Sequence, residues 1–449
     1  VAPSRGLGDV YKRQLVFNMS LPMMISMLVQ ALYNIVDSIF VAKLSENALT
    51  AVSLAFPLQT LIIAVATGTG VGVNALLSKS LGAHKYDEAN KIGINGAVLY
   101  AFSYVIFLIL GLTIVKPFYM SQIGNADVEI MDMGVSYLST VMIFSFGIFA
   151  EIFFERVLTS TGRTIFSMTS QLCGAITNII LDPIMIFGLL GFPKLGATGA
   201  AVATVVGQCV AAVVAFACNH KFNHEISLSF KGYSPDFKIM GTIYAIGIPS
   251  IIMQSIGSVM TYSMNRILIG FSSTAAAVFG VYFKLQSFFF MPVFGLNNGI
   301  TPIIAFNYGA QNRKRMVKTI KVSLITAFCL LFVGFACFEF IPQVLLGMFS
   351  ASDDMLQIGV PALRIIGVHF LIAWFCIIVG TVFQALGKAV FSMIVSIMRQ
   401  LVVLIPAAYI LSKLGGLHAV WWAFPIAEVI SFTAVSYTHL RAHETELHL

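Results

Sequence analysis

Five carboxylates stand within long apolar stretches of the sequence: Asp37, Glu151, Glu155, Asp182 and Glu428. Charged side chains are costly in the hydrocarbon of a bilayer, so those found there usually face protein or water and serve ion or substrate pathways. Loss of water also favours the neutral form of a carboxyl group, which can then switch between a protonated and a charged state. This pattern indicates proton or cation binding.

Helical spacing places polar neighbours beside two of these acids. Asp182 follows Asn178 by four residues, so the carboxylate and the amide share a helix face and can hold a proton or a small cation between them. The face of Asp37 carries three further polar side chains one or two turns earlier, those of Gln30, Tyr33 and Asn34. The alternative for any one acid is a simple ion pair with a basic neighbour such as Arg156.

The composition shows what must position these residues. Of the 449 residues, 58% are hydrophobic and 10% are charged, whereas about 25% of a soluble domain is charged. Many apolar runs reach the roughly 18 residues that a helix needs to cross a bilayer. A soluble enzyme, a disordered chain and a coiled coil are therefore excluded, and an all-α polytopic membrane protein is predicted.

Apolar runs and loop residues predict twelve transmembrane helices. Their expected spans are 15–42, 51–78, 92–115, 134–158, 165–192, 197–220, 239–270, 276–307, 319–341, 358–386, 390–412 and 417–435. We expect residues 15–220 to form an N-terminal lobe of six helices, 221–238 a cytoplasmic linker, and 239–435 a C-terminal lobe. The stretches 1–14 and 436–449 resemble translated adapter sequence and are predicted to be non-native tails, which would leave the last helix short.

An internal repeat supports the division into two lobes. A shift of 227 residues matches Gly82 with Gly309 and their surroundings, and a shift of 225 matches GRTIFSM with GKAVFSM. Because six helices is an even number, both halves enter the membrane from the same side. We therefore expect pseudo-symmetric lobes related by an axis along the membrane normal, with a cleft between them. Two bundles around a central cleft suit alternating access.

Loop charges predict the orientation. The loops after the second, fourth, sixth, eighth and tenth expected helices hold most of the loop Lys and Arg residues, and the alternate loops hold several acids. By the positive-inside rule, both termini are expected in the cytoplasm. We expect a multi-pass protein of a bacterial cytoplasmic membrane, surrounded by lipid and monomeric.

Several motifs together carry a resemblance to a known family. They are QALYNIVDSIFVAKLS, the paired loops LGAHKYDEA and YGAQNRKRM, RVLTSTGRT against QALGKAV, and NIILDP. In this combination the chain resembles the MATE (multidrug and toxic compound extrusion) transporters over about 15–435. The segment 280–311 is similar to the bacterial MepA-like branch of that family.

The resemblance implies a secondary active antiporter that exports cationic or amphipathic drugs in exchange for H⁺ or Na⁺ by alternating access. It implies a cation site, for H⁺ or for Na⁺ at the two aspartates, formed by Asp37, Asn178, Asp182 and Thr204. It also implies a substrate cavity, which we expect to be lined by Gln30, Tyr33, Asn34 and Glu155. The expected helices 239–270 and 358–386 carry no acid, which shifts the predicted coupling site to the N-terminal lobe.

Two other functions were weighed against this one. A flippase of the same fold superfamily, for lipid-linked oligosaccharides, would use a basic central cavity, and four basic residues keep that reading open: Arg266, Lys284, Arg364 and Arg399. An intramembrane enzyme is not expected, because the sequence has no HExxH, P-loop or Gly-x-Ser-x-Gly motif. We expect no cofactor beyond the coupling ion, no metal site formed by the six cysteines, and no nucleic-acid partner.

Overall fold

The computed structural model describes residues 12–123, 128–226, 228, 234–349 and 352–446, and all regular structure in these ranges is helical. Ten of the described helices are long and apolar enough to cross a bilayer, and the number rises to twelve if each of two bent helix pairs is one span. The prediction of an all-α, multi-span membrane protein is confirmed. Residues 1–11 and 447–449 of the predicted non-native tails lie outside the described residues.

The first half of the chain contains α1 (Lys12–Leu44), α2 (Glu46–Gly82), α3 (Tyr86–Thr113), α4 (Val115–Ile123), α5 (Val128–Ile143), α6 (Phe146–Ser160), α7 (Thr164–Phe187) and α8 (Ala197–Phe222). The second half contains α9 (Phe237–Ile269), α10 (Ser273–Gly309), α11 (Arg313–Phe340), α12 (Pro342–Gly347), α13 (Asp353–Gly367), α14 (Phe370–Ala385), α15 (Ala389–Ile397), the π-helix η1 (Met398–Leu404), α16 (Ile405–Leu414), α17 (Gly416–Val420) and α18 (Ala423–Glu446). We call α1–α8 the first bundle and α9–α18 the second bundle.

Two expected straight helices are bent. The span expected over 134–158 consists of α5 and α6, which meet at 41°, and the span over 358–386 consists of α13 and α14, which meet at 49°. At the second bend, the ring nitrogen Nδ1 of His369 lies 2.6 Å from the carbonyl oxygen of Ile366 and so disturbs the regular helix turn. Hydropathy shows how long an apolar segment is but carries no information about such contacts.

The helices near the C-terminus also differ from expectation. The span expected over 390–412 contains the π-helical turns Met398–Leu404, which end just before Pro406, a residue that cannot donate a backbone hydrogen bond. The last expected helix, 417–435, is observed as the short α17 followed by α18, which continues to Glu446.

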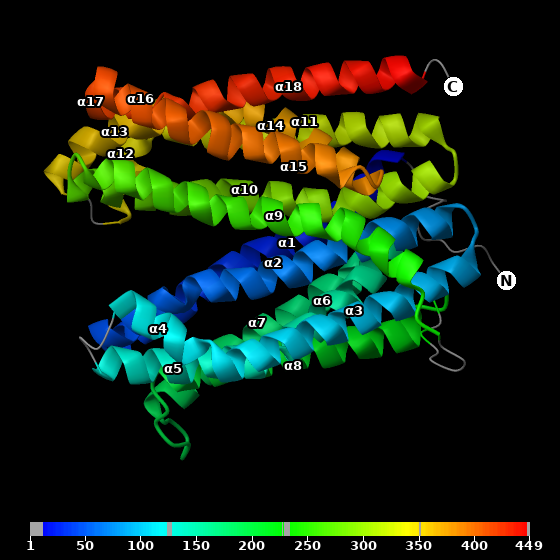
Figure 1. The fold of residues 1–449 in the computed structure, drawn as a ribbon, viewed down its shortest axis with the longest axis horizontal. Helices are drawn as coiled ribbons and strands as arrows, with labels where there is room; N and C mark the ends of the chain where they lie inside the picture. The colour runs from blue at the N-terminus through cyan, green and yellow to red at the C-terminus, as the bar shows by residue number, and fades with distance from the viewer. Residues whose placement is uncertain (1–11, 124–127, 227, 229–233, 350–351, 447–449) are drawn as a thin grey trace.

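The helices form two layers, one for each bundle, that meet through their first two long helices (Figure 1). In the contact between the layers α1 packs against α10 and α2 packs against α9. The connections after α2, α6, α8, α10 and α14 lie at one end of the molecule, which we call the basic end because most of the loop Lys and Arg residues lie there. The bundles meet toward the basic end and diverge toward the opposite end (Figure 1).

Glycines bring the two bundles into backbone contact at the basic end. A Cβ atom on Gly82 of α2 would overlap the carbonyl oxygen of Phe306 of α10, and a Cβ on Gly309 would overlap the carbonyl oxygen of Lys79. Without a side chain these helices can cross with their backbones touching. Gly82 and Gly309 are matched by the 227-residue shift, so the internal repeat brings the same residue to the crossing from each side.

Two polar contacts join the bundles nearer the middle of the helices. The Thr67 hydroxyl of α2 donates to Oε1 of Gln254 of α9 at 2.8 Å. Nη1 of Arg156 of α6 donates to Oδ1 of Asn298 of α10 at 3.1 Å. Together with the glycine crossing, these contacts close the molecule at and behind the basic end, and they lie beneath the region where the bundles diverge.

Candidate functional site

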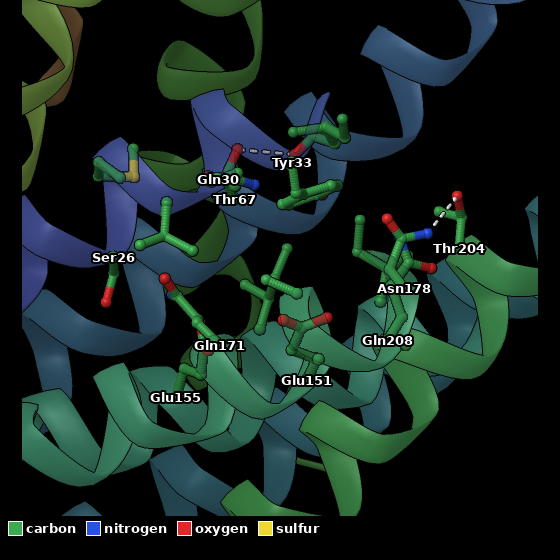
Figure 2. Close-up of a pocket in the computed structure, with 18 of the residues that line it drawn as sticks. Ser26, Gln30, Tyr33, Thr67, Glu151, Glu155, Gln171, Asn178, Thr204 and Gln208 are labelled. Carbon is green, nitrogen blue, oxygen red and sulfur yellow. Dashed lines mark hydrogen bonds between the residues drawn. The ribbon is translucent and has the colours of Figure 1, made fainter. Parts of the chain in front are cut away.

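A cavity of about 100 Å³ lies in the first bundle, between α1, α6, α7 and α8 (Figure 2). We call it the first cavity. Its polar lining consists of Ser26, Gln30, Tyr33, Thr67, Glu151, Glu155, Arg156, Gln171, Asn178, Thr204, Gln208 and Asn298. Two carboxylates and one guanidinium therefore border it, so the cavity is acidic when both glutamates are charged.

Glu155 is held in place by α7. Its carboxylate accepts a hydrogen bond from Nε2 of Gln171 at 2.7 Å and another from the hydroxyl of Ser170 at 3.2 Å. The side chain is buried, with 5% of the residue exposed. Glu151, one helical turn earlier, also lines the cavity. The neighbouring Arg156 directs Nη1 to the second bundle, so Glu155 is oriented chiefly by hydrogen bonds from α7.

A second group of polar side chains joins α7 to α8. Asp182 is fully buried, and Nδ2 of Asn178 lies 3.4 Å from its Oδ1 and 3.3 Å from Oγ1 of Thr204. With the amide turned over, the nitrogen donates to Oδ2 of Asp182 at 3.3 Å and the oxygen accepts from the backbone N–H of Thr204 at 3.2 Å. In either orientation, the Asn178 amide directs an N–H group at the Asp182 carboxylate.

Asp37 approaches this group from α1. It is half-buried, and it lies close enough to Asp182, Tyr33 and Tyr137 for its charge to act on all three. Its buried Oδ1 atom has no hydrogen-bond partner among the described residues. A buried carboxylate oxygen without a partner is costly, and a proton or a cation bound there would satisfy it.

The structure places the sequence-predicted residues in two sets. Gln30, Tyr33 and Glu155 line the first cavity, and Gln30 and Tyr33 are hydrogen-bonded to each other (Figure 2). Asn178 and Thr204 line its far wall. The two aspartates lie behind this wall, where Asp182 contacts Asn178.

The expected place of Asn34 in the cavity is wrong. On α1 the cavity lining ends at Tyr33, and the Asn34 side chain is exposed. Helical spacing gives the direction of a side chain around the helix axis, and it does not give the depth at which a cavity ends. Asp37, one turn farther along α1, also lies beyond the cavity lining.

Other lining residues were not predicted from the sequence. Ser26, Thr67, Gln171 and Gln208 line the cavity from α1, α2, α7 and α8, and Asn298 reaches it from the second bundle. A polar residue within an apolar run was the available signal for each, but uncharged polar residues are common in such runs and single ones point to no site. Within the described ranges, no three His, Cys, Asp or Glu side chains gather where they could hold a metal ion.

Comparison with known proteins identifies the family. The MatE family model matches residues 22–184 and 249–410, one segment in each half, so the chain belongs to the MatE family. This confirms the resemblance seen in the motifs, and the family is one of transporters rather than enzymes.

Individual relatives and solved structures agree with this assignment. The multidrug export protein MepA of Staphylococcus haemolyticus is 28% identical over 428 residues, which cover 94% of this chain and 91% of that protein. A multidrug resistance MATE family transporter of the MOP superfamily, solved in an outward-facing conformation, superposes with a TM-score of 0.91 at 26% identity, with 99% of each chain covered. A MOP superfamily transporter from Pyrococcus furiosus, whose binding pocket is described as having reversed polarity, gives a TM-score of 0.90 at 26% identity, with 98% of each chain covered.

Proposed function

We propose that this protein is a secondary active antiporter that exports cationic and amphipathic drugs in exchange for H⁺ or Na⁺. The single observation that carries the proposal is the pair of aspartates on α1 and α7, close to each other and beside the Asn178 amide. Family membership and the multidrug export names of the relatives support the direction and the substrate class.

The coupling ion is expected to bind at Asp37 and Asp182. Both carboxylates lie inside the bundle, where one unbalanced charge is tolerated poorly and two are tolerated worse. Binding of H⁺ or Na⁺ removes charge from the pair, and its release restores that charge. Inward movement of one H⁺ supplies about 2.3 kcal/mol per 100 mV of membrane potential, and one pH unit adds about 1.4 kcal/mol. These energies are sufficient to drive export of a drug against a gradient.

The drug is expected to bind in the first cavity. Glu151 and Glu155 provide negative charge, Tyr33 provides an aromatic face, and methionines of α1 provide a flexible apolar wall. A drug cation and the coupling ion thus use neighbouring acids that share one wall. Occupation of one set then disfavours occupation of the other through charge repulsion, as exchange requires.

Glu155→Gln is expected to raise the Kd of ethidium about tenfold, which corresponds to about 1.4 kcal/mol. The amide keeps the size of the side chain and its contacts with α7 but removes the negative charge. Fluorescence titration of the purified protein measures this change. Glu88→Gln, an exposed acid beside Lys85 at the basic end, is the matched control and should bind ethidium as the wild type does. Equal affinity for Glu155→Gln and Glu88→Gln would remove Glu155 from the drug site.

Ethidium transport in vesicles under separately imposed H⁺ and Na⁺ gradients tests the coupling. A pH gradient alone is expected to drive ethidium movement, and a Na⁺ gradient alone is expected to drive less. If neither gradient moves ethidium in vesicles that contain folded protein, the antiport proposal fails.

We also propose that the basic end faces the cytoplasm of a bacterial cell, as the positive-inside rule indicates. The region where the bundles diverge would then face outward. A reporter fused after α18 that is active only in the cytoplasm checks this orientation, and an inactive reporter would reverse it.

A further inference from the structure

A second, larger cavity lies mainly in the second bundle. Its volume is about 430 Å³, and it is bounded by α9, α10, α14, α15 and η1, with α2 and α6 of the first bundle on one side. Its polar lining contains the amides of Asn74, Gln254, Asn297, Asn298, Gln384 and Gln400. It also contains hydroxyl groups and two guanidinium groups, those of Arg156 and Arg399. The described lining includes no Asp, Glu or Lys, so the charge that faces this cavity is positive.

The internal repeat explains why the two cavities differ. The 225-residue shift that aligns GRTIFSM with GKAVFSM places Cys376 and Gly380 opposite Glu151 and Glu155. Glu151 and Glu155 line the first cavity, while Cys376 and Gly380 line the second. Corresponding walls of the two bundles therefore carry acids in one and no acid in the other.

Arg399 enters the second cavity from the π-helix η1. Its Nη1 atom lies 3.4 Å from Oε1 and 3.5 Å from Oε2 of Glu428 on α18, and Glu428 itself is 5% exposed and does not line the cavity. These long contacts use one nitrogen of a group that has five N–H donors. The Arg399 side chain is 26% exposed, so the rest of the guanidinium is open to a molecule in the cavity.

Arg156 completes the positive lining where the bundles meet. The residue is 8% exposed, its Nη1 donates to Asn298, and its Nε atom has no hydrogen-bond partner among the described residues. Arg156 borders both cavities, so they are separated by little more than this side chain and its neighbour Asn298. A single elongated molecule can therefore have one part in each cavity.

We propose that the second cavity binds the carboxylate of zwitterionic amphipathic substrates while the first cavity binds their cationic part. A guanidinium forms short, charge-assisted hydrogen bonds with a carboxylate, and amides and hydroxyls supply further donors. Phe294, Phe383 and Met253 provide apolar walls for the body of the molecule. This proposal rests on the proposed drug export and extends it from cations to zwitterions.

Rhodamine 110 and rhodamine 123 test the proposal, because rhodamine 123 is the methyl ester of rhodamine 110 and lacks only the free carboxylate. Fluorescence anisotropy with the purified full-length protein measures both affinities. The double variant Arg399→Gln/Glu428→Gln removes the guanidinium without leaving its buried partner charged. It is expected to raise the Kd of rhodamine 110 about tenfold more than that of rhodamine 123, as loss of a hydrogen bond between charged groups requires.

Two further variants keep the test decisive. Gln400→Glu introduces a carboxylate of nearly equal size into the second cavity and is expected to weaken rhodamine 110 selectively, even if the double variant does not fold. Arg364→Gln/Glu339→Gln removes an exposed ion pair outside the cavity and should leave the ratio of the two affinities at the wild-type value.

The outcomes separate this proposal from the one on which it rests. No binding of rhodamine 110 by the wild type, or an equal change for both dyes in the double variant and in Gln400→Glu, would overturn the carboxylate site. Unchanged binding of rhodamine 123 by Glu155→Gln would instead count against the cationic drug site in the first cavity, and would leave the ratio measured at Arg399 intact.

Discussion

Asp182→Asn is expected to reduce gradient-driven ethidium efflux to the level of vesicles without the protein. Asparagine has nearly the size of aspartate and keeps a polar contact with Asn178, but it can neither take up nor release a proton and binds Na⁺ more weakly. Asp37→Asn should have the same effect, because the two carboxylates act on each other. Transport assays in vesicles with equal amounts of folded protein measure the loss.

The control for this result is Asp132→Asn. Asp132 lies on α5, is exposed, and takes no part in the group around Asp182. Its replacement should leave efflux unchanged. Efflux that remains coupled to a gradient in both Asp37→Asn and Asp182→Asn would show that the coupling ion binds elsewhere in the chain.

Gly82→Val is expected to abolish transport for a different reason. The new side chain would overlap the backbone of Phe306, and backbone cannot move aside as a side chain can. Overpacking costs about 1–3 kcal/mol even where neighbours adjust, so the conformation closed at the basic end should be depopulated about tenfold or more. Gly309→Val should behave in the same way against Lys79. Ethidium efflux and the labelling rate of a cysteine introduced at this crossing measure the two consequences.

Gly280→Val is the matched control for the crossing. Gly280 lies on α10, as Gly309 does, but a Cβ atom there would meet no other atom within 4 Å. It carries the same helix-propensity change without the overlap, and it should transport normally. If Gly82→Val and Gly280→Val transport equally well, the crossing at the basic end is not required to be tight.

The sequence predicted the fold and the chemical character of the site because both depend on local information. Apolar length predicts spans, and a spacing of four residues places Asn178 beside Asp182, whose carboxylate it contacts in the structure. Thr204 lies on another helix, so no spacing connects it with Asp182, and it was reached only through the family resemblance. Its place beside Asn178 depends on how closely α7 packs on α8.

What the sequence did not predict depends on contacts between distant segments. The hydrogen bond from Arg156 to Asn298 joins residues 142 positions apart, and the bend at His369 and the π-helical turns around Arg399 arise from local backbone geometry that hydropathy does not record. Asn34 was misplaced because the depth of the cavity is set by the packing of several helices. The positive lining of the second cavity was likewise invisible until Arg156 and Arg399 were seen to face the same space.

Arg156 forms a shared boundary between two compartments of opposite polarity, and this has a thermodynamic consequence. An anion that settles against the guanidinium from one side lowers the positive potential felt by a cation on the other. Such linkage is symmetric in binding free energy: by whatever factor one guest changes the affinity of the second, the second changes the affinity of the first. The protein would therefore discriminate between molecules by the distance between their opposite charges as well as by their net charge.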